Sequence, residues 1–327
     1  MENLRTVVSI WRTALLALLL SPPAFGGTPI DVYILSGQSN MVGSGVVSQL
    51  DPDLALQEDV LYHFSITLDP ASQTPVGAPE ILAEAWGPLR ELSAEGHSFG
   101  LELAFGRAVA DASSNQVAII KTAINGAAIR LYTPAYGYWQ FLGPYAQSVI
   151  AELESMGYAP TVKALVWVQG SSDANSAVHH ALYAQRLDEL TDAVRGLWGA
   201  DLLIAQSQQH CCGPFAQSQI DVVREAKATF TQADANATLT ETDDIQMRSD
   251  MIHFHWRGLL ELGERLAADS LAHQAEDING DGQVDTADLG ILLGAFGATG
   301  RTRADLNGDR VVNTADLAML LSAFGSL

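Results

Sequence analysis

The sequence is poor in cysteine, and this excludes a disulfide-stapled fold. Only two cysteines occur in 327 residues, Cys211 and Cys212, and they are adjacent. Neighbouring cysteines cannot close a loop, so no loop-closing framework is possible. A strained vicinal disulfide and two free thiols are both open to this pair. We expect no catalytic role for either.

Positive charge is also scarce. The chain has 17 Lys and Arg against 38 Asp and Glu, which gives a formal net charge of −21. This balance argues against nucleic-acid backbones and anionic membrane surfaces as partners. Charged residues make up only 17% of the chain and hydrophobic residues 48%, so a large core is expected rather than disorder. The length suits one large domain and a small one.

The only markedly apolar run lies near the start of the chain. Arg5 and Arg12 precede and border the apolar residues 13–20, and small residues follow at Ala24 and Gly26. The run is shorter than the roughly 20 residues that cross a bilayer. The pattern therefore predicts a signal peptide over residues 1–26 and a secreted or cell-surface protein with no membrane partner.

Residues 31–272 alternate short β-branched runs with amphipathic helices. The expected strands are Val32–Leu35, Val117–Lys121, Ala164–Val168 and Leu202–Gln206. Two helical stripes are expected at Leu101, Phe105, Ala108 and Val109, and at Leu187, Leu190, Val194 and Leu197. This order predicts an α/β domain of three layers, with a parallel sheet between helices. Residues 43–98 are rich in Pro, Gly and Asp, and we expect long connections there.

The first expected strand ends in a serine flanked by two amides. Val32–Leu35 leads through a Ser-Gly pair into Gln38-Ser39-Asn40. A hydroxyl at the end of a central strand, beside backbone N–H groups opening a helix, is how acyl-transfer enzymes present a nucleophile. Met41 stands where Gly-x-Ser-x-Gly requires its second glycine, so this is not that motif. Taken alone, Ser39 fits a helix cap equally well.

Three other stretches supply partners for Ser39. Asp250 precedes His253 by three residues, a spacing at which the carboxylate can orient an imidazole that accepts the Ser39 proton. Gly126 follows a strand in an Asn-Gly turn, where its N–H could face an oxyanion. Gln169 ends another strand with an amide that can donate to the same oxygen. In isolation, each also fits an ordinary turn, surface pair or strand end.

Aromatic residues gather between positions 132 and 145. Six of the chain's 24 aromatic residues lie there: Tyr132, Tyr136, Tyr138, Trp139, Phe141 and Tyr145. Clustered rings suit stacking on sugar faces, and packing within a loop explains them about as well. The cluster favours a carbohydrate substrate over a long acyl chain.

The chain ends in an internal duplication spaced by 28 residues. Asp277–Asp288 recurs as Asp305–Asp316, and each copy runs into a short helix. The two apolar stripes are Leu289, Leu292, Leu293 and Phe296, and Leu317, Leu320, Leu321 and Phe324. Duplicated units of this size usually bury such stripes against each other.

Each copy has the ligand spacing of a calcium loop, with oxygen ligands at positions 1, 3, 5, 9 and 12 and a carbonyl at position 7. The first set is Asp277, Asn279, Asp281, Gln283 (carbonyl), Asp285 and Asp288. The second set is Asp305, Asn307, Asp309, Val311 (carbonyl), Asn313 and Asp316. Two structural Ca²⁺ sites are therefore predicted. Arg310 replaces the glycine of position 6, so the second site is expected to be strained or weaker.

Residues 31–272 resemble the SGNH hydrolases, most closely the branch of sialate O-acetylesterases and family-six acetylxylan esterases. The resemblance rests on stretches that occur in the family's order: Gly37-Gln-Ser-Asn-Met41, Ser98-Phe-Gly-Leu-Glu-Leu103, Ala123-Ile-Asn-Gly126, Trp167-Val-Gln-Gly170, Val223-Arg-Glu-Ala226 and Asp250-x-x-His253-Phe254. It implies a flavodoxin-like fold with Ser39 as nucleophile, His253 as base and Asp250 as its orienter. The Ser39 and Gly126 amides and the Gln169 side chain would form the oxyanion hole. The sequence departs from the family at Val168 and Ser171, where the family has polar residues, and this bears on substrate preference.

The duplicated segment resembles a type I dockerin, a small all-α module that binds two calcium ions and docks onto a cohesin. Together the resemblances predict a signal peptide (1–26), an esterase domain (27–273) and a dockerin-like domain (274–327). The expected function is removal of O-acetyl groups from carbohydrates, with no metal in the chemistry. The rivals are a lipase-like esterase, a catalytically silent carbohydrate-binding domain, and a scaffold component acting through its dockerin-like module.

Overall fold

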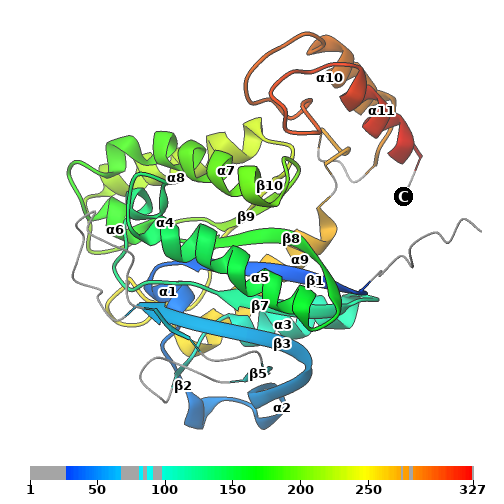
Figure 1. Ribbon diagram of the computed structural model, residues 1–327. Helices are drawn as coiled ribbons and strands as arrows, with labels where there is room; N and C mark the ends of the chain where they lie inside the picture. Colours follow the sequence, from blue (N-terminus) through cyan, green and yellow to red (C-terminus); the bar gives the residue numbers. More distant parts are fainter. Residues whose placement is uncertain are drawn as a thin grey trace, which may run out of the picture.

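The computed structural model describes residues 27–67, 81–83, 87–90, 98–273, 275–279 and 283–325. The predicted signal peptide lies outside these residues. A central sheet lies between two layers of helices, and a small C-terminal module, orange to red in Figure 1, sits at one side. Among the described helices, none combines the length and the apolar character needed to cross a bilayer.

The strands are β1 (Thr28–Gly37), β2 (Gly45–Val46), β3 (Leu56–Thr67), β4 (Ile81–Ala83), β5 (Gly87–Arg90), β6 (Ser98–Phe99), β7 (Gln116–Lys121), β8 (Tyr158–Val168), β9 (Leu203–Ser207) and β10 (Ala237–Thr240). The helices of the large domain are α1 (Ser39–Val42), α2 (Pro52–Ala55), α3 (Glu102–Ala112), α4 (Tyr138–Gln140), α5 (Ala146–Ser155), α6 (Ser171–Ala174), α7 (Tyr183–Trp198), α8 (Gln217–Ala233) and α9 (Trp256–Ala272). The 3₁₀ turns are η1 (Val47–Gln49), η2 (Ile129–Tyr132) and η4 (His180–Leu182), and η3 (Phe141–Tyr145) is a π-helical turn.

The main sheet has the order β10-β9-β8-β1-β7-β3-β4, with β5 also paired to β3. The pairs from β10 across to β3 are parallel, and only β4 and β5 run antiparallel. From β1 the chain goes first to β3 and returns to β7 on one side, and it then crosses to β8, β9 and β10 on the other. The carboxyl end of β1 is therefore a topological switch point, where α/β sheets place their ligands.

Side-chain alternation along β1 explains the two helical layers. Val32 and Ile34 point into the core beneath α5, α7 and α8, whereas Tyr33 and Leu35 point into the core beneath α3 and α9. Successive residues of a strand face opposite sides of the sheet, so a strand covered on both faces becomes apolar throughout. The expected three-layer α/β fold is confirmed, and the four expected strands lie in β1, β7, β8 and β9.

The expectation of long connections over residues 43–98 is wrong in part. Leu56–Thr67 forms β3, which pairs in parallel with β7 inside the main sheet. The acidic pair at Glu58 and Asp59 precedes a clear alternation in which Val60, Tyr62 and Phe64 are buried on one face. That alternation is the strand signal, and the surrounding polar residues conceal it in the composition of the whole segment.

The aromatic segment packs inside the protein. Tyr132, Tyr138, Trp139 and Phe141 belong to the core under α5, α7 and α8, and only Tyr136 and Tyr145 are partly exposed. The segment runs through α4 and η3 into α5, and η3 is a π-helical turn that contains Pro144. Proline lacks an amide hydrogen and cannot continue the ordinary ladder, which accounts for the wider turn. Packing, rather than sugar stacking, explains these rings.

The C-terminal module contains α10 (Thr286–Gly294) and α11 (Thr314–Ala323), each after one copy of the repeat. Its small core includes Leu292 and Leu320, both fully buried. The expectation that the whole stripes are buried is wrong, because Leu293 and Leu321 are each 53% exposed and Phe296 and Phe324 are also exposed. The two copies thus leave equivalent apolar side chains at the surface.

A fully buried ion pair joins three elements beneath the end of β1. Lys121 Nζ on β7 lies 2.7 Å from Glu102 Oε2 on α3, and neither side chain is exposed. The same ammonium donates to the carbonyl of Val42 at the end of α1, 2.8 Å away. Glu102 Oε1 accepts the Gly100 N–H at 2.8 Å. Burial lowers the pKa of Lys121, and the charge and hydrogen bond of Glu102 oppose this shift.

Removing one partner of this pair is expected to be costly. Glu102→Gln leaves the Lys121 ammonium buried without a counter-charge, so the free energy of unfolding should fall by about 3–5 kcal/mol. Urea unfolding measures the loss. The matched control is Asp59→Asn in the exposed pair with Arg107, for which a loss of at most about 1 kcal/mol is expected. Equal losses in the two variants would contradict the structural role given to the buried pair.

Candidate active site

The site begins with a close contact at the end of β1. Gly37 has φ +145°, and a Cβ placed on it would stand 2.1 Å from the carbonyl oxygen of Val168 on β8. The next amide, that of Gln38, donates to the same carbonyl at 3.0 Å. The buried hydroxyl of Tyr132 donates to the Gly37 carbonyl at 2.6 Å. These contacts fix where the chain turns into α1, and Ser39 is the first residue of that helix.

The structure brings Ser39, His253 and Asp250 together in one hydrogen-bonded chain. His253 Nε2 lies 3.0 Å from Ser39 Oγ, and His253 Nδ1 lies 2.9 Å from Asp250 Oδ2. The serine comes from the carboxyl end of β1, and the other two residues come from the loop before α9. A hydroxyl, an imidazole and a carboxylate in this order are the arrangement that activates a serine nucleophile.

Asp250 also organises the loop that carries the histidine. Its Oδ1 accepts the backbone N–H groups of Ile252 and His253, both at 2.9 Å. Burial raises the pKa of Asp250, but the hydrogen bonds from His253 and Ile252 and the nearby imidazole outweigh it and lower the pKa to about 2. Between these residues Met251 has φ +55°, a left-handed conformation that residues with side chains rarely adopt. The carboxylate therefore stabilises a tight turn as well as the imidazole.

Asn40 joins the serine turn to the histidine loop. Its Nδ2 donates to the Ile252 carbonyl at 3.0 Å, and its Oδ1 accepts the Phe254 N–H at 3.0 Å. The two contacts bracket His253 along the backbone, so the position of the imidazole is set from the residue next to Ser39. No role was predicted for Asn40, although an amide directly beside the expected nucleophile is a signal that points to one.

Gly126 lies in a turn tied to the end of β1. The Ala127 N–H returns to the Ile124 carbonyl at 3.3 Å, and the Ile124 N–H donates to the Gly37 carbonyl at 3.0 Å. Gly126 has φ +68°, which glycine adopts readily, and it is exposed. The structure therefore places this turn beside the Ser39 turn, on the same edge of the sheet.

Gln169 is held in a buried network rather than by a hydrogen bond to Ser39. Its Nε2 lies 2.5 Å from Asp173 Oδ2, 3.1 Å from the Ala127 carbonyl and 3.3 Å from Gln38 Oε1. The residue is only 3% exposed. Burial raises the pKa of Asp173, and its bonds with Ile129 and Gln169 oppose the shift. Gln169 can join an oxyanion hole only by giving up one of these bonds.

The adjacent cysteines are free thiols in the structure. Their sulfur atoms lie 2.7 Å apart, and the Cys211 amide donates to Asp243 Oδ1 at 2.9 Å. The hydrogen bond with Cys212, aided by burial and the charge of Asp243, raises the pKa of Cys211 to about 11. A thiol with so high a pKa is a poor nucleophile at neutral pH.

The second repeat forms a loop in which one carboxylate oxygen is buried and unpaired. Asp305 Oδ2 accepts the Arg310 N–H at 2.7 Å, whereas Asp305 Oδ1 is buried without a hydrogen-bond partner. Burial raises the pKa of Asp305, and the charges of Asp316 and Asp309 add to the shift. An unpartnered carboxylate oxygen beside two other acids, with Asn and carbonyl oxygens in the same loop, fits a Ca²⁺ ligand set. Among the described residues, no three His, Cys, Asp or Glu side chains form a metal cluster.

The first repeat shows the same local pattern where it is described. Asp288 accepts the N–H groups of Asn279 at 3.0 Å and Asp285 at 2.9 Å, as Asp316 accepts those of Asn307 at 3.2 Å and Asn313 at 2.7 Å. Asp281, the expected ligand at position 5, lies outside the described residues. Both helices also begin with a capping box, Asp285 with Asp288 and Asn313 with Asp316.

Solved structures share the fold of the large domain. A crystal structure of a protein from Arabidopsis thaliana is similar with a TM-score of 0.58 and 23% identity, over 74% of this chain and 98% of that one. A carbohydrate acetylesterase from Xanthomonas citri has a TM-score of 0.54 and 16% identity, over 74% of this chain and 56% of that one. NanS has a TM-score of 0.55 and 11% identity, over 75% and 98%. No curated protein matches the chain significantly.

Family models account for both parts of the sequence. Residues 29–272 match the family described as carbohydrate esterase, sialic acid-specific acetylesterase, and residues 275–324 match the dockerin type I domain. The first match covers about three quarters of the chain, and the similar folds agree with it. The expected relationship and the expected enzyme class are thereby confirmed. The chain belongs to the sialic acid-specific acetylesterase family of carbohydrate esterases, and it carries a dockerin type I domain behind the esterase region.

Proposed function

We propose that this enzyme removes O-acetyl groups from a carbohydrate through a serine mechanism, with Ser39 as nucleophile, His253 as base and Asp250 as orienter. The observation that carries the proposal is the continuous hydrogen-bonded chain from Ser39 Oγ through both imidazole nitrogens to Asp250. It lies at the carboxyl edge of the sheet, at the switch point beside β1.

In the first step, Ser39 Oγ attacks the carbonyl carbon of the acetyl ester while His253 Nε2 takes its proton. The carbonyl oxygen becomes an oxyanion, for which the backbone N–H groups of Ser39 and Gly126 are the proposed donors. The C–O bond to the sugar then breaks, and the imidazolium returns the proton to the leaving sugar oxygen. The enzyme is left as acetyl-Ser39.

In the second step, water attacks the acetyl carbon and gives a proton to His253. The bond to Ser39 Oγ breaks, the serine recovers its proton, and acetate leaves. The Asp250 carboxylate stays ionised throughout, so it stabilises the imidazolium that forms in both steps. These steps draw on no metal or organic cofactor.

The family description suggests O-acetylated sialic acid as the substrate, and acetylated xylan is the alternative raised by the sequence resemblance. We further propose the division into a signal peptide (1–26), an esterase domain (27–273) and a dockerin-like domain (274–327), and an extracellular location. Dockerin type I domains generally bind calcium. Two Ca²⁺ ions are proposed here, one in each loop, where their role is to order the module.

A cohesin-type protein is the partner proposed for the C-terminal domain. The match to the dockerin type I model implies such a partner. The exposed pairs Leu293 with Leu321 and Phe296 with Phe324 support it, because repeated apolar side chains at equivalent surface positions fit a protein contact.

Ser39→Ala tests the nucleophile. Hydrolysis of p-nitrophenyl acetate should fall at least about a thousandfold, because the acyl acceptor is lost. Ser48→Ala, an exposed serine nearby on η1, is the matched control and should keep full activity. Acetate release from O-acetyl sialic acid and from acetylated xylan then separates the two substrate classes. Equal activity of Ser39→Ala and the wild type would exclude Ser39 as the nucleophile.

Asn40→Ala tests the contact between the serine turn and the histidine loop. Loss of both bonds to the backbone around His253 should lower kcat about 10- to 100-fold through misplacement of the imidazole. KM should change little, because Asn40 is not proposed to touch the sugar. Asn115→Ala removes an amide bonded to Asp31 elsewhere in the fold and serves as control. A variant with a reduced melting temperature but wild-type kcat would show that Asn40 has only a structural role.

The pH profile tests the charge state of Asp250. Its folded pKa of about 2 lies below the usual 3.8, so the carboxylate's contribution is present above about pH 4 and is lost as pH falls towards 2. Above pH 4 Asp250 should therefore add no proton to the acid limb of kcat/KM. Asp250→Asn should lower the plateau by up to about 10⁴-fold. Two protons on the acid limb between pH 4 and 6 would contradict the assignment.

A further inference from the structure

The C-terminal module is held against the esterase domain by an arginine that contacts three carboxylates. Arg301 Nε lies 2.9 Å from Asp188 Oδ1, and its terminal nitrogens lie 2.9 Å from Asp192 Oδ1 and 2.5 Å from Asp234 Oδ2. Its guanidinium also lies over the ring of Phe230, with 4.8 Å to the ring centre. Asp188 and Asp192 are on α7, and Asp234 follows α8.

Asp234 is the buried centre of this contact. The residue is 6% exposed, and Arg195 of the same domain holds both of its oxygens at 2.7 and 2.9 Å. Burial raises the pKa of Asp234, but Arg195 and Arg301 outweigh it and the net shift is downward. A carboxylate shared by two guanidinium groups keeps a fixed geometry, unlike an exposed surface pair.

Contacts at Leu306 and Gly308 bring the second repeat to the esterase domain. Asn236 Nδ2 donates to the Leu306 carbonyl at 3.2 Å, and Ala235 packs in the core of the module. Gly308 lies so close to Ala200 that an added Cβ would stand 2.4 Å from its carbonyl oxygen. The loop from Asp305 to Asp316 is therefore part of the interface.

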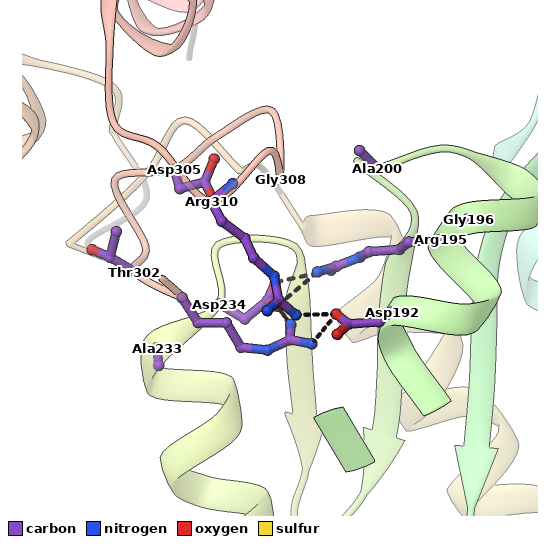
Figure 2. Close-up of a pocket in the computed structure, with 11 residues that line it drawn as sticks. Asp192, Arg195, Gly196, Ala200, Ala233, Asp234, Thr302, Asp305, Gly308 and Arg310 are labelled. Atoms are coloured by element: carbon purple, nitrogen blue, oxygen red, sulfur yellow. Dashed lines mark hydrogen bonds and ion pairs between the residues drawn. The ribbon is translucent and has the colours of Figure 1, made fainter. Parts of the chain in front are cut away.

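Arg310 belongs to both the loop and the interface. Its backbone has φ +68°, and its N–H donates to Asp305 Oδ2 at 2.7 Å. Its guanidinium bonds to Asp192 on α7, and Figure 2 shows the side chain reaching from the loop to that carboxylate. The repeat provides an internal comparison, because the equivalent position 28 residues earlier is Gly282. Only the second copy has a side chain at position 6 that can reach the esterase domain.

A cavity of about 260 Å³ separates the two parts beside these residues, and Asp305 and Arg310 line it together with Asp192 and Asp234. Asp305 is the expected position 1 ligand of the second calcium loop. The second loop therefore borders the cavity between the two parts (Figure 2).

We propose that docking of the module on the esterase domain and calcium binding in the second loop are thermodynamically coupled through the Asp192–Arg310 contact. Asp192 bonds to the Arg310 side chain and thereby stabilises the left-handed backbone of Arg310. The N–H of Arg310 in turn holds the Asp305 carboxylate. Docking thereby presets the loop for the ion. By reciprocity, an ion in the second loop strengthens docking by the same factor, whereas the first loop binds independently. The inference rests on the proposed binding of two calcium ions.

Calorimetric titration of the full mature chain with calcium alone, after chelator treatment, tests the coupling. The wild type should bind two ions. Asp192→Asn should weaken one of them about five- to tenfold and leave the other unchanged. Asp221→Asn makes the same charge change on α8 away from the interface and should match the wild type.

A second pair of variants isolates the arginine. In an Arg310→Gly background, Asp192→Asn should no longer alter the affinity of the second site, because the connecting side chain is gone. As a readout of docking, calcium should protect residues 273–275 of the wild type from protease, and less so in Asp192→Asn.

The outcomes separate the coupling from the proposed calcium sites. Two unchanged affinities in Asp192→Asn, or the same loss in the Arg310→Gly background, overturn the coupling while calcium binding stands. A titration without binding heat, together with no calcium-dependent protection, overturns both.

Discussion

The close approach of Gly37 to the Val168 carbonyl is the constraint on which the site depends. A side chain at that position would separate β1 from β8, because its Cβ would stand 2.1 Å from the oxygen. With glycine the two strands stay paired to their ends, and the next amide bonds across the gap. The position of Ser39 beyond the end of β1 is therefore fixed, and the other contacts of the site form around this residue.

A second layer of contacts transmits this constraint to the histidine loop. Asn40 bonds to the backbone on both sides of His253, and the buried ammonium of Lys121 holds the carbonyl that ends α1. The Tyr132 hydroxyl donates a hydrogen bond to the Gly37 carbonyl at the start of the same turn. None of these residues is proposed to react. They hold the reacting groups at hydrogen-bond distance. Such prior positioning provides much of the rate acceleration of an enzyme.

The sequence predicts those features that depend on local pattern and loses those that depend on distant partners. Alternation and spacing identified β1, β7, β8, β9 and both repeats, because each signal lies within a dozen residues. β3 was missed since acidic neighbours concealed its alternating face. The aromatic residues were ambiguous because ring composition says nothing about burial. Gln169 was expected to serve an oxyanion hole from its place at a strand end, whereas its contacts with the Ala127 carbonyl and Gln38 Oε1 depend on segments 42 and 131 residues away in the chain.

The capping carboxylates of the repeats have a consequence for how the loops meet an ion. Asp316 accepts N–H groups from Leu306 and Asn307 at the start of its loop and from Asn313 near its end. The same residue is the proposed ligand at position 12. The 12-residue ring is thus closed by protein hydrogen bonds at the same carboxylate that would meet the ion. The position of that ligand is therefore tied to the backbone of the loop, so a substitution of Asp316 would remove the ligand and the ring closure together.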